Sequence, residues 1–458
     1  MRIDLPDDVQ YIISRLEENS YEAYAVGGCV RDCLMGREPK DWDVCTTALP
    51  EQMMEVFKDQ RIIETGLKHG TITLLINSNH YELTTYRTDG KYSDNRRPDN
   101  VKFVNVLKRD LARRDFTINA MAYNQKAGLV DYYNGQQDLS DKRIKCVGNP
   151  NKRFKEDALR IMRALRFAGE MGFSIEQGTA QAMYDNKELL NNISVERIAV
   201  ELNKLICATD IVPLLNEHKS ILTWIIPEMI PMIGFEQNTP YHCYDVFMHT
   251  LHSVDSAVHD VKIRLTMLLH DTGKPHRYTE EDGVGHFYGH PAVSADIANE
   301  VLKRLRYDKN TVDTVTELIL YHDADIHPSH KRIKRWLNRI GEERFKQLLQ
   351  VRRADALAQT PGLAEKKLLL VESVSAELDI VLEQQQCFLL KDLAVSGKDL
   401  IDQGIKEGKQ IGALLNRLMD MVINEEVEND REALLEKVQE WDRALTPVPK
   451  VTKCYNVD

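Results

Sequence analysis

The chain has 458 residues, of which 43% are hydrophobic and 29% charged, an ordinary globular composition with length for about three domains. Its net charge of −11 and pI near 5.8 exclude a protein that coats nucleic acid through bulk positive charge, although a local basic groove is compatible with them. The acidic N-terminus lacks the apolar core of a secretory signal, and no apolar window is long enough to span a bilayer. The eight cysteines form no Cys-x-x-Cys pair, so neither a disulfide framework nor a zinc ribbon is expected. We expect a cytoplasmic protein with no membrane association.

The first distinctive stretch runs from Tyr24 to Asp43, after an amphipathic helix expected over residues 7–18. An apolar run enters a pair of glycines, which predicts a strand, a turn whose backbone closely approaches a ligand, and a return strand. Because strand side chains alternate, Asp41 and Asp43 are expected on one face and Trp42 on the other. Two carboxylates that project together repel unless a cation lies between them, and Mg²⁺ prefers hard oxygen ligands together with substrate phosphates. The stretch therefore predicts a metal-dependent site that handles phosphates.

A hairpin is predicted next, because residues 71–76 and 81–86 are rich in β-branched and aromatic side chains and are separated by Asn-Ser-Asn-His. On its second arm Glu82 shares a face with Thr84 and Tyr86. Glu82 is either a third carboxylate near the Asp-x-Asp pair or a solvated strand glutamate, and both interpretations stay open here.

Two polar segments follow the hairpin. Residues 87–98 are rich in turn formers and basic at their end, which predicts a mobile loop. Residues 113–123 are expected to form a helix that carries Asp115 and Asn119 one turn apart. The alternative for the second segment is a surface charge cluster that caps a helix.

A strongly amphipathic pattern over residues 154–167 predicts one continuous helix. Asp157 and Arg160 are three positions apart on it and therefore share a face. For an unidentified helix, the simplest interpretation is an intrahelical salt bridge worth roughly a few tenths of a kcal/mol.

Residues 240–330 are rich in histidine. The dipeptide His270-Asp271 closes an apolar helix pattern, and His249, His290 and His322-Asp323 lie on neighbouring segments. A lone histidine is usually exposed or satisfied in a core, but this arrangement is much less expected by chance. Imidazoles and carboxylates together suit a divalent or transition metal.

The remaining chain, residues 331–458, has long helical patterns and no internal repeat. Its first segment is basic with one aromatic residue and includes Lys331 and Arg332, which predicts either phosphate contacts or a solvated helix face. Lys398 lies among several glycines that either let backbone amides approach phosphates or cap helices.

In order along the chain, these patterns resemble a known family. The motifs that carry the resemblance are Gly27-Gly28-x-x-Arg31-Asp32, Asp41-x-Asp43, Glu82-x-Thr-Thr-x-Arg87, Arg113-Arg114-Asp115-Phe-Thr-x-Asn119 and Glu156-Asp157-x-x-Arg160. They resemble tRNA nucleotidyltransferases and bacterial poly(A) polymerases of the polymerase-β-like superfamily, and the histidine region resembles HD phosphohydrolases. The resemblance covers nearly the whole chain.

The resemblance implies an α+β fold. Its parts are a small nucleotidyltransferase head with a mixed sheet (1–147), an all-helical neck that selects the base and binds RNA (148–240), an HD-type metal-binding domain (241–330) and a helical tail that binds tRNA (331–458).

Roles for individual residues follow from the same resemblance. Catalysis with two Mg²⁺ ions is implied for Asp41 and Asp43, with Glu82 as a third carboxylate. Nucleotide contacts are implied for Gly27, Gly28, Arg31, Arg114, Asp115, Asn119, Asp157, Arg160 and Arg163. A divalent or transition metal in the HD region is implied for His249, His270 and Asp271, and less directly for His290, His322 and Asp323. RNA contacts are implied for Arg96, Arg97, Lys331, Arg332 and Lys398.

The implied activity is template-independent addition of C and A nucleotides to the 3′ end of tRNA from CTP and ATP, by in-line attack that releases pyrophosphate. The Asp157 carboxylate would accept from the exocyclic amino group of cytosine or adenine while Arg160 donates to a ring acceptor, whereas uracil and guanine would present a carbonyl oxygen instead. The alternatives are a poly(A) polymerase, an A-only or CC-only enzyme, and an HD phosphohydrolase with an RNA-binding head. The full-length loop over 87–98 argues against a CC-only enzyme. Whether the HD region is catalytic or structural stays open.

Overall fold

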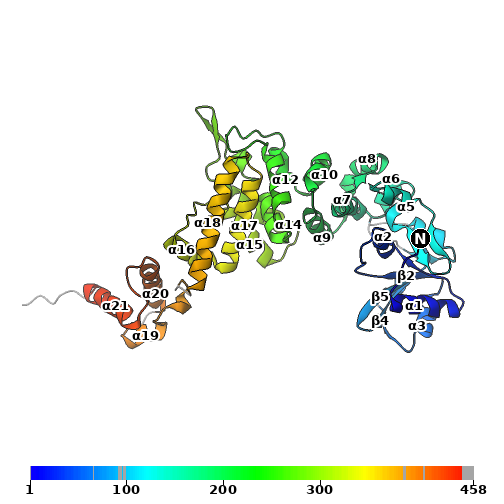
Figure 1. Cartoon of the computed structure of the whole chain (residues 1–458), viewed down its shortest axis with the longest axis horizontal. Helices are drawn as coiled ribbons and strands as arrows, with labels where there is room; N and C mark the ends of the chain where they lie inside the picture. The colour runs from blue at the N-terminus through cyan, green and yellow to red at the C-terminus, as the bar shows by residue number, and fades with distance from the viewer. Residues whose placement is uncertain are drawn as a thin grey trace, which may run out of the picture.

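The computed structural model describes residues 2–64, 66–90, 95, 100–384, 388–405 and 408–445. The chain forms an elongated arc with the N-terminal head at one end, a helical body in the middle and a small helical tail at the other end (Figure 1). The expected α+β architecture, with the mixed sheet confined to the head, is confirmed. Among the described residues, no helix is both long enough and apolar enough to cross a membrane.

The head is built on a seven-stranded sheet with the order β3-β4-β5-β2-β1-β8-β9. Its strands are β1 (Ala23–Val26), β2 (Asp43–Thr46), β3 (Arg61–Ile63), β4 (Thr71–Ile76), β5 (Asn79–Thr85), β8 (Met121–Asn124) and β9 (Gly128–Asp131). The β2–β5 pair is parallel and the other neighbours are antiparallel, which makes the sheet mixed.

Two apolar cores hold the two faces of this sheet. The larger one joins the sheet to the helices α1 (Asp7–Glu18), α2 (Gly28–Leu34) and α3 (Pro50–Val56), and the smaller one joins it to α4 (Leu107–Ala112). Strand alternation explains the division, because Val44 faces the larger core and its neighbour Cys45 the smaller one. The expected helix over 7–18 and the expected hairpin are confirmed. The hairpin turn is shorter than expected, because Asn77 and Ser78 both adopt the left-handed conformation and the strand resumes directly after them.

The helix predicted over residues 113–123 is wrong. Helix α4 ends at Ala112, a single 3₁₀ turn follows at Thr117–Asn119, and β8 begins at Met121. Pairing with β1 and β9 places β8 inside the sheet, and this tertiary pairing overrides the local helical pattern.

The loop predicted over 87–98 begins with an ordered strand. β6 (Arg87–Asp89) pairs with β7 (Val101–Phe103) in a small antiparallel ribbon. Arg96 and Arg97 lie outside the described residues.

The head ends with α5 (Gly135–Ser140) and β10 (Arg143–Ile144). The neck contains α6 (Pro150–Glu156), α7 (Leu159–Met171), β11 (Ser174–Ile175), α8 (Gln177–Asn186), α9 (Val195–Ile206), α10 (Ile211–Glu217) and α11 (Lys219–Ile225). It is not wholly helical as expected, because β11 pairs with β10 in parallel. The single helix predicted over 154–167 is wrong, because the chain breaks at Asp157, whose backbone is extended with φ −137° and ψ 103°. The Asp157 carboxylate accepts the Leu159 amide at 3.1 Å and so stabilises the first turn of α7.

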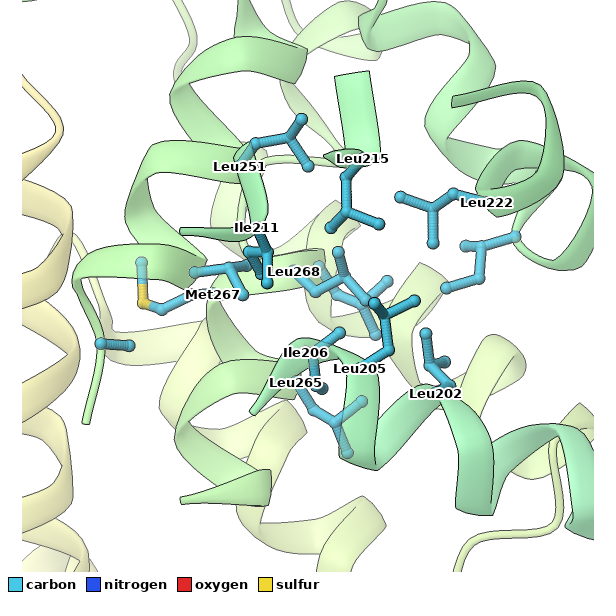
Figure 2. Close-up of a cluster of buried hydrophobic side chains, with 14 of the residues drawn as sticks. Leu202, Leu205, Ile206, Ile211, Leu215, Leu222, Leu251, Leu265, Met267 and Leu268 are labelled. Atoms are coloured by element: carbon cyan, nitrogen blue, oxygen red, sulfur yellow. The ribbon is translucent and has the colours of Figure 1, made fainter. Parts of the chain in front are cut away.

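The body contains α12 (Val246–Ser256), α13 (Val261–Leu269), α14 (His290–Arg304), α15 (Lys309–Tyr321), α16 (His330–Ile340), α17 (Glu342–Leu357), α18 (Leu363–Glu383) and the hairpin β12–β13 (Thr279–Glu281 and Val284–His286). One continuous apolar core runs from the neck helices into these helices. Figure 2 shows part of it, where Leu202, Leu205 and Ile206 of α9 meet Leu265 and Leu268 of α13. Each such buried side chain contributes about 1.5–3 kcal/mol.

A buried arginine adds a polar link between neck and body. Arg264 on α13 is 1% exposed, and its Nη1 donates to the carbonyls of Ile206 and Ala208 at 2.5 and 2.6 Å. Its Nη2 donates to the carbonyl of Ala257 at 2.8 Å. These hydrogen bonds satisfy carbonyls at the ends of α9 and α12 and fix the two parts to each other.

The tail has its own small core. Helices α19 (Gly397–Asp402), α20 (Gly408–Ile423) and α21 (Arg431–Leu445) bury Leu400, Leu418 and Leu434 against one another.

Candidate functional site

A cleft of about 740 Å³ lies where the head meets α7. Its head side includes Gly27, Gly28, Arg31, Asp41, Asp43, Arg114, Asp115 and Asn119, and its α7 side includes Arg163, Arg166 and Phe167. Residues separated by more than one hundred positions therefore converge on one cavity, and it contains most of the nucleotide-site residues expected from the sequence.

The sheet register sets the face from which the carboxylates at this cleft project. Asp43 opens β2 and is the direct partner of Glu82 on β5 in the parallel pair, so the two side chains project from the same face. Asp41 lies two residues before Asp43 and is exposed, whereas Trp42 between them is buried. The expected division of Asp41 and Asp43 from Trp42 is therefore present, and Glu82 lies beside the pair rather than isolated in solvent.

The surroundings of Asp43 disfavour its negative charge. Burial, together with the nearby carboxylates of Glu82 and Asp41, raises the pKa of Asp43 to about 6, although Arg114 opposes the shift. A divalent cation would relieve this repulsion, and a set of exposed carboxylate oxygens is the ligand type that Mg²⁺ prefers. The residues present thus fit the metal ions expected from the sequence.

The first of the paired glycines leaves room for the guanidinium group of Arg114 as well as for a turn. Gly27 has φ +87°, and a Cβ atom there would lie 2.8 Å from Nη1 of Arg114. Arg31 on α2 donates from Nη1 to Oδ1 of Asn119 at 2.7 Å and from Nη2 to Asp32 at 2.7 Å. Two guanidinium groups therefore line the cleft next to the carboxylates, which is the charge pattern expected for a triphosphate.

Asp115 connects the head to α7. Its Oδ1 accepts from the amide of Phe116 at 2.8 Å and from Nδ2 of Asn119 at 3.1 Å. Its Oδ2 accepts from Nε and Nη2 of Arg163 at 2.9 and 2.6 Å. Burial opposes its ionisation, but Arg163 and Arg160 hold the pKa of Asp115 well below its usual range. Asp115 and Asn119 thus come together as predicted, without the helix that was expected to align them.

Asp157 and Arg160 make no ion pair with each other, so the alternative interpretation of an intrahelical salt bridge between them is wrong. The break before α7 separates them, and Asp157 pairs instead with Arg197 at 3.4 Å. Arg160 is buried, where it donates to Oε2 of Glu156 at 3.1 Å and to the carbonyl of Arg113 at 2.8 Å. Among the described residues that line the cleft, neither Asp157 nor Arg160 is present.

The α7 wall of the cleft includes Arg166 and Phe167, which the sequence analysis missed. The Phe167 ring lies in the cleft with the guanidinium carbons of Arg31, Arg163 and Arg166 at 5.2, 5.1 and 4.1 Å from its centroid. Arg163, Arg166 and Phe167 recur at helical spacing after Arg160, a signal that was present but gave no indication that this face meets the head.

A second cluster lies in the body, where buried histidines surround Asp271. His270 and Asp271 directly follow α13, His249 lies on α12, His290 opens α14 and His322 directly follows α15. A cavity of about 750 Å³ opens onto this cluster and is also lined by Lys274 and Asp323. Asp323 is exposed and lies outside the groups of ligand atoms that are close enough to share an ion. Asp355 on α17 joins the cluster instead, with Oδ1 at 3.0 Å from Nε2 of His249.

Asp355 was missed because it is one charged residue within a charged helix, with no neighbouring histidine in sequence. It lies beyond residue 330, where the HD-type domain was expected to end. The helix that carries it packs on α12, α13 and α15, so that the cluster draws on a wider part of the body than expected.

The histidines of the cluster are oriented by the backbone. Nδ1 of His249, His270, His290 and His322 lies 3.2, 2.7, 2.9 and 2.7 Å from the carbonyls of Ala358, Met267, Phe287 and Ile319, respectively. A carbonyl only accepts, so Nδ1 carries the proton and Nε2 points toward the cluster as the ligand atom. This arrangement is typical of histidines that bind a metal.

Burial and nearby charges shift the pKa values of two of these imidazoles in opposite directions. Burial lowers the pKa of His322 to about 3. Burial also acts to lower the pKa of His270, but Asp271 and Asp355 overcome it and raise that pKa to about 9. A metal ion would displace the proton that His270 holds, and the buried donor set of imidazoles and carboxylates fits a divalent or transition ion.

The basic residues expected to bind RNA are spread along the body and tail. Lys331 and Arg332 lie in the first turn of α16, where Arg332 is 3.7 Å from Asp325, and Lys398 is exposed in α19. Their use in RNA binding stays a prediction.

Three family models match successive parts of the chain. The poly A polymerase head domain matches residues 23–145, the probable RNA and SrmB-binding site of polymerase A matches 172–232, and the putative domain 2 of tRNA nucleotidyltransferase matches 288–438. With the carboxylate-lined cleft, these matches define the head as a nucleotidyltransferase of the poly(A) polymerase type.

Two curated relatives extend the likeness over nearly the whole chain. The CCA-adding enzyme of Lactobacillus delbrueckii subsp. bulgaricus is 34% identical over 434 residues, covering 93% of this chain and 95% of the relative. That of Pediococcus pentosaceus is 33% identical over 444 residues, covering 95% and 98%. The chain belongs to the family of CCA-adding enzymes.

Solved structures agree with this assignment. The CCA-adding enzyme of Bacillus stearothermophilus in complex with CTP superposes with a TM-score of 0.69 at 30% identity, covering 95% of this chain and 97% of the other. The Thermotoga maritima CCA-adding enzyme complexed with tRNA has a TM-score of 0.57 at 19% identity, covering 96% and 100%, and supports the fold.

The raised pKa of Asp43 gives the first testable prediction. A proton bound below pH 6 must leave before a cation binds, so the affinity for Mg²⁺ should fall by about tenfold for each pH unit below 6. Glu82→Gln removes a negative neighbour and should move this break to lower pH, whereas Glu55→Gln on α3, an exposed residue, should leave it in place. Calorimetric titration with Mg²⁺ between pH 5 and 8 measures the break. Equal affinity at pH 5 and pH 7 would contradict the assignment of Asp43 as a ligand.

Proposed function

We propose that this chain adds C, C and A to the 3′ end of tRNA, without a nucleic-acid template and with CTP and ATP as substrates. Membership in the CCA-adding family and the likeness to a CTP-bound relative support the substrates. The observation that carries the proposal is the cleft, where Asp41 and Asp43 lie beside the guanidinium groups of Arg31 and Arg114 and Glu82 is the sheet partner of Asp43. Such an enzyme acts on tRNA in the cytoplasm.

The proposed mechanism assigns different work to the two sides of the cleft. Bound divalent ions, generally Mg²⁺ in this family, would supply charge neutralisation of the triphosphate and a lower pKa for the RNA 3′-hydroxyl. Asp41 and Asp43, with Glu82 behind them, would hold these ions. Arg31 and Arg114 would contact the phosphates, with Gly27 and Gly28 allowing their close approach.

On the neck side, Asp115 would hold Arg163 against the cleft through its two charge-assisted hydrogen bonds, while Asn119 orients Arg31. The sugar of the nucleotide would lie beside these groups, near Phe167. Because one wall belongs to the head and the other to α7, small rotations of α7 would change the shape of the base site without moving the carboxylates.

We assign base selection to Asp157 and Arg160 on the strength of the Glu-Asp-x-x-Arg motif. In the structure Arg160 donates to Glu156 and to backbone carbonyls, so contact with a base requires that one of these hydrogen bonds be exchanged for the base. Oδ1 of Asp157 accepts from the Leu159 amide at the start of α7, and Oδ2, which accepts from Arg197 at 3.4 Å, would also accept from the amino group of cytosine or adenine.

RNA contacts beyond the terminus would come from basic residues on the loop, body and tail. Arg96, Arg97, Lys331, Arg332 and Lys398 are the residues proposed for this role. Their contacts with phosphates would position the tRNA without reading its sequence.

The activity is tested with tRNAs that end before the first C, after C and after CC, each supplied with one nucleoside triphosphate at a time. We expect CTP to be used by the first two tRNAs and ATP by the third. ATP use on every tRNA would instead indicate a poly(A) polymerase, and use of one nucleotide alone would indicate a CC-only or A-only enzyme. Asp41→Ala should lower the rate by at least about 10³-fold. Asp59→Ala, which removes an exposed carboxylate paired with Arg15, should leave the rate unchanged.

Base selection is tested with Asp157→Asn. Asparagine retains an oxygen that can cap α7 but adds a donor that uracil can accept, so the variant separates folding from selection. We expect UTP incorporation relative to CTP to increase by about tenfold, within the 1–3 kcal/mol of discrimination that a good base contact supplies. Unchanged discrimination at unchanged stability would refute the role of Asp157. Asp185→Asn, on the exposed side of α8, serves as the control.

A second candidate activity rests on the histidine cluster. The four imidazoles oriented by backbone carbonyls toward two buried carboxylates support metal-dependent hydrolysis of a phosphate ester in the adjoining cavity. With a metal bound, the site would supply an activated water. Lys274, which is 2.7 Å from Asp271 and borders the cavity, would contact the phosphate.

Hydrolysis is measured with phosphate monoesters and cyclic phosphodiesters in the presence of Mn²⁺, Co²⁺ or Ni²⁺. We expect chelator-sensitive activity that survives Asp41→Ala and is lost in His270→Ala. Absence of hydrolysis of both substrate classes with every metal would instead assign the cluster a structural role.

A further inference from the structure

We propose that Asp110 positions Arg114 for contact with the triphosphate of the incoming nucleotide. The inference deepens the proposed function of the head cleft and rests on it, because Arg114 is assigned there to the phosphates. Asp110 lies on α4 and is 0% exposed, and it is absent from the described residues that line the cleft. It therefore acts on the nucleotide only through another side chain.

The two oxygens of the Asp110 carboxylate have different partners. Oδ1 accepts from Nε of Arg113 at 3.0 Å and from the amide of Arg87, the first residue of β6, at 3.2 Å. Oδ2 is buried, makes no hydrogen bond within the described part of the chain and lies 3.8 Å from Nη2 of Arg114. A buried carboxylate oxygen costs free energy unless a positive charge faces it. Oδ1 thus serves the local structure of the head, whereas Oδ2 directs its charge to Arg114.

The local backbone holds Arg114 within reach of Asp110. α4 ends at Ala112, but the turn continues beyond it, because the Arg114 amide donates to the carbonyl of Leu111 at 3.2 Å. Asp110 and Arg114 are therefore one turn apart and share a face. The guanidinium of Arg114 lines the cleft, where its Nη1 fills the space that a Cβ atom on Gly27 would need. Nη2 thus lies toward Asp110, and Nη1 lies beside the glycine turn at which the phosphates are expected.

A second carboxylate competes for Arg114. The charge of Arg114 opposes the rise in the pKa of Asp43, one of the carboxylates assigned to the metal ions. A guanidinium that paired with Asp43 would leave the phosphates and occupy an oxygen that a Mg²⁺ ion needs. The buried carboxylate of Asp110 offsets this attraction and keeps Arg114 in the fixed orientation that a bidentate contact with a phosphate requires.

Helix α4 is a fixed support for this contact, because the neck holds its C-terminal end. Nη1 of Arg153 donates to the carbonyl of Ala112 at 3.0 Å, and Nη2 of Arg160 donates to the carbonyl of Arg113 at 2.8 Å. These hydrogen bonds satisfy carbonyls that the end of a helix leaves without a partner. Asp110 is thus fixed between the β6–β7 ribbon and the neck.

The positioning role is tested with Asp110→Asn, which retains an acceptor in place of Oδ1 but puts a neutral NH₂ group in place of Oδ2 beside Arg114. We expect kcat/KM for CTP and for ATP to fall by the same factor, roughly ten- to one-hundredfold, because both nucleotides share the charge-assisted contacts to the phosphates. KM for tRNA and the preference for CTP over UTP should not change. Inhibition by cytidine, which has no phosphate, should stay the same.

A double-mutant cycle shows whether Asp110 acts through Arg114. In the Arg114→Gln background, Asp110→Asn should cause no further loss of kcat/KM for CTP. Losses that multiply, or a full rate in Asp110→Asn alone, would overturn the positioning role. No effect of Arg114→Gln would refute the phosphate contact and the positioning role with it.

Two further measurements keep the test decisive. If Asp110→Asn does not fold, Asp110→Glu takes its place in the cycle, because it retains the charge but displaces it by one methylene group. The same cycle on CTP binding, measured by calorimetry, decides the inference even if the products show that the chain adds nucleotides other than C, C and A.

Asp138→Asn is the matched control. Asp138 is also a buried aspartate of the head, 3% exposed, whose Oδ2 accepts from the Thr117 hydroxyl at 2.8 Å and whose Oδ1 accepts from Nη2 of Arg143 at 3.1 Å. It lies outside the described residues that line the cleft. Thermal unfolding should show a loss of stability in both variants, with kcat/KM reduced only in Asp110→Asn. An equal fall of kcat/KM in Asp138→Asn would show that the effect comes from destabilisation of the head and would contradict the inference.

Discussion

The ion pair between the buried Asp115 and the partly buried Arg163 is the contact on which the head site depends. It joins a carboxylate of the head to the helix that forms the opposite wall of the cleft, through hydrogen bonds of 2.9 and 2.6 Å. A buried pair gains little net stability because both charges lose water, but removal of one partner would leave the other charge unpaired. Its contribution is therefore geometric: it fixes where α7 meets the sheet. Through Asn119 the same carboxylate also orients Arg31, so one residue positions both a phosphate contact and the neck wall.

In both sites of the chain, carboxylates lie close together, but one site is open to water and the other is buried. In the head, repulsion among Asp41, Asp43 and Glu82 disfavours three bare carboxylates beside an open cleft, and bound cations would relieve it. In the body, the buried Asp271 and the partly buried Asp355 are grouped with four histidine side chains beside one cavity. Oxygen ligands in the open cleft suit Mg²⁺, whereas buried nitrogen-rich ligands suit transition ions. The donor sets of the two sites thus differ in the ions that they would favour.

How much of this could be predicted from the sequence depends on whether the information was local. The exposed Asp41 and Asp43, the buried Trp42 between them and the hairpin that carries Glu82 follow from period-two alternation, and all three are present, although β2 itself begins only at Asp43. The helix over 113–123 failed because pairing of β8 between β1 and β9 is a long-range property. The prediction of one helix over 154–167 failed because the apolar stripe continues across the break at Asp157. Periodicity therefore gave no sign that two helices share the pattern.

The site residues that were not predicted were missed for the same reason, because their roles depend on long-range packing. Arg166 and Phe167 follow Arg160 at helical spacing. Only the packing of α7 against the head shows that their face lines a cleft. Asp355 comes more than 80 positions after Asp271 and has no motif of its own. The His270-Asp271 pair located the histidine cluster, whereas the approach of Asp355 to it required the distances.

The central claim is that one cleft, with a fixed set of carboxylates and a base-selecting wall, builds a defined terminus without a template. The most direct test supplies a tRNA lacking its last three nucleotides with all four nucleoside triphosphates at once, followed by sequencing of the 3′ ends. The account predicts that the products end in CCA and grow no further. Long runs of A, mixed sequences containing U or G, or unextended tRNA would contradict it.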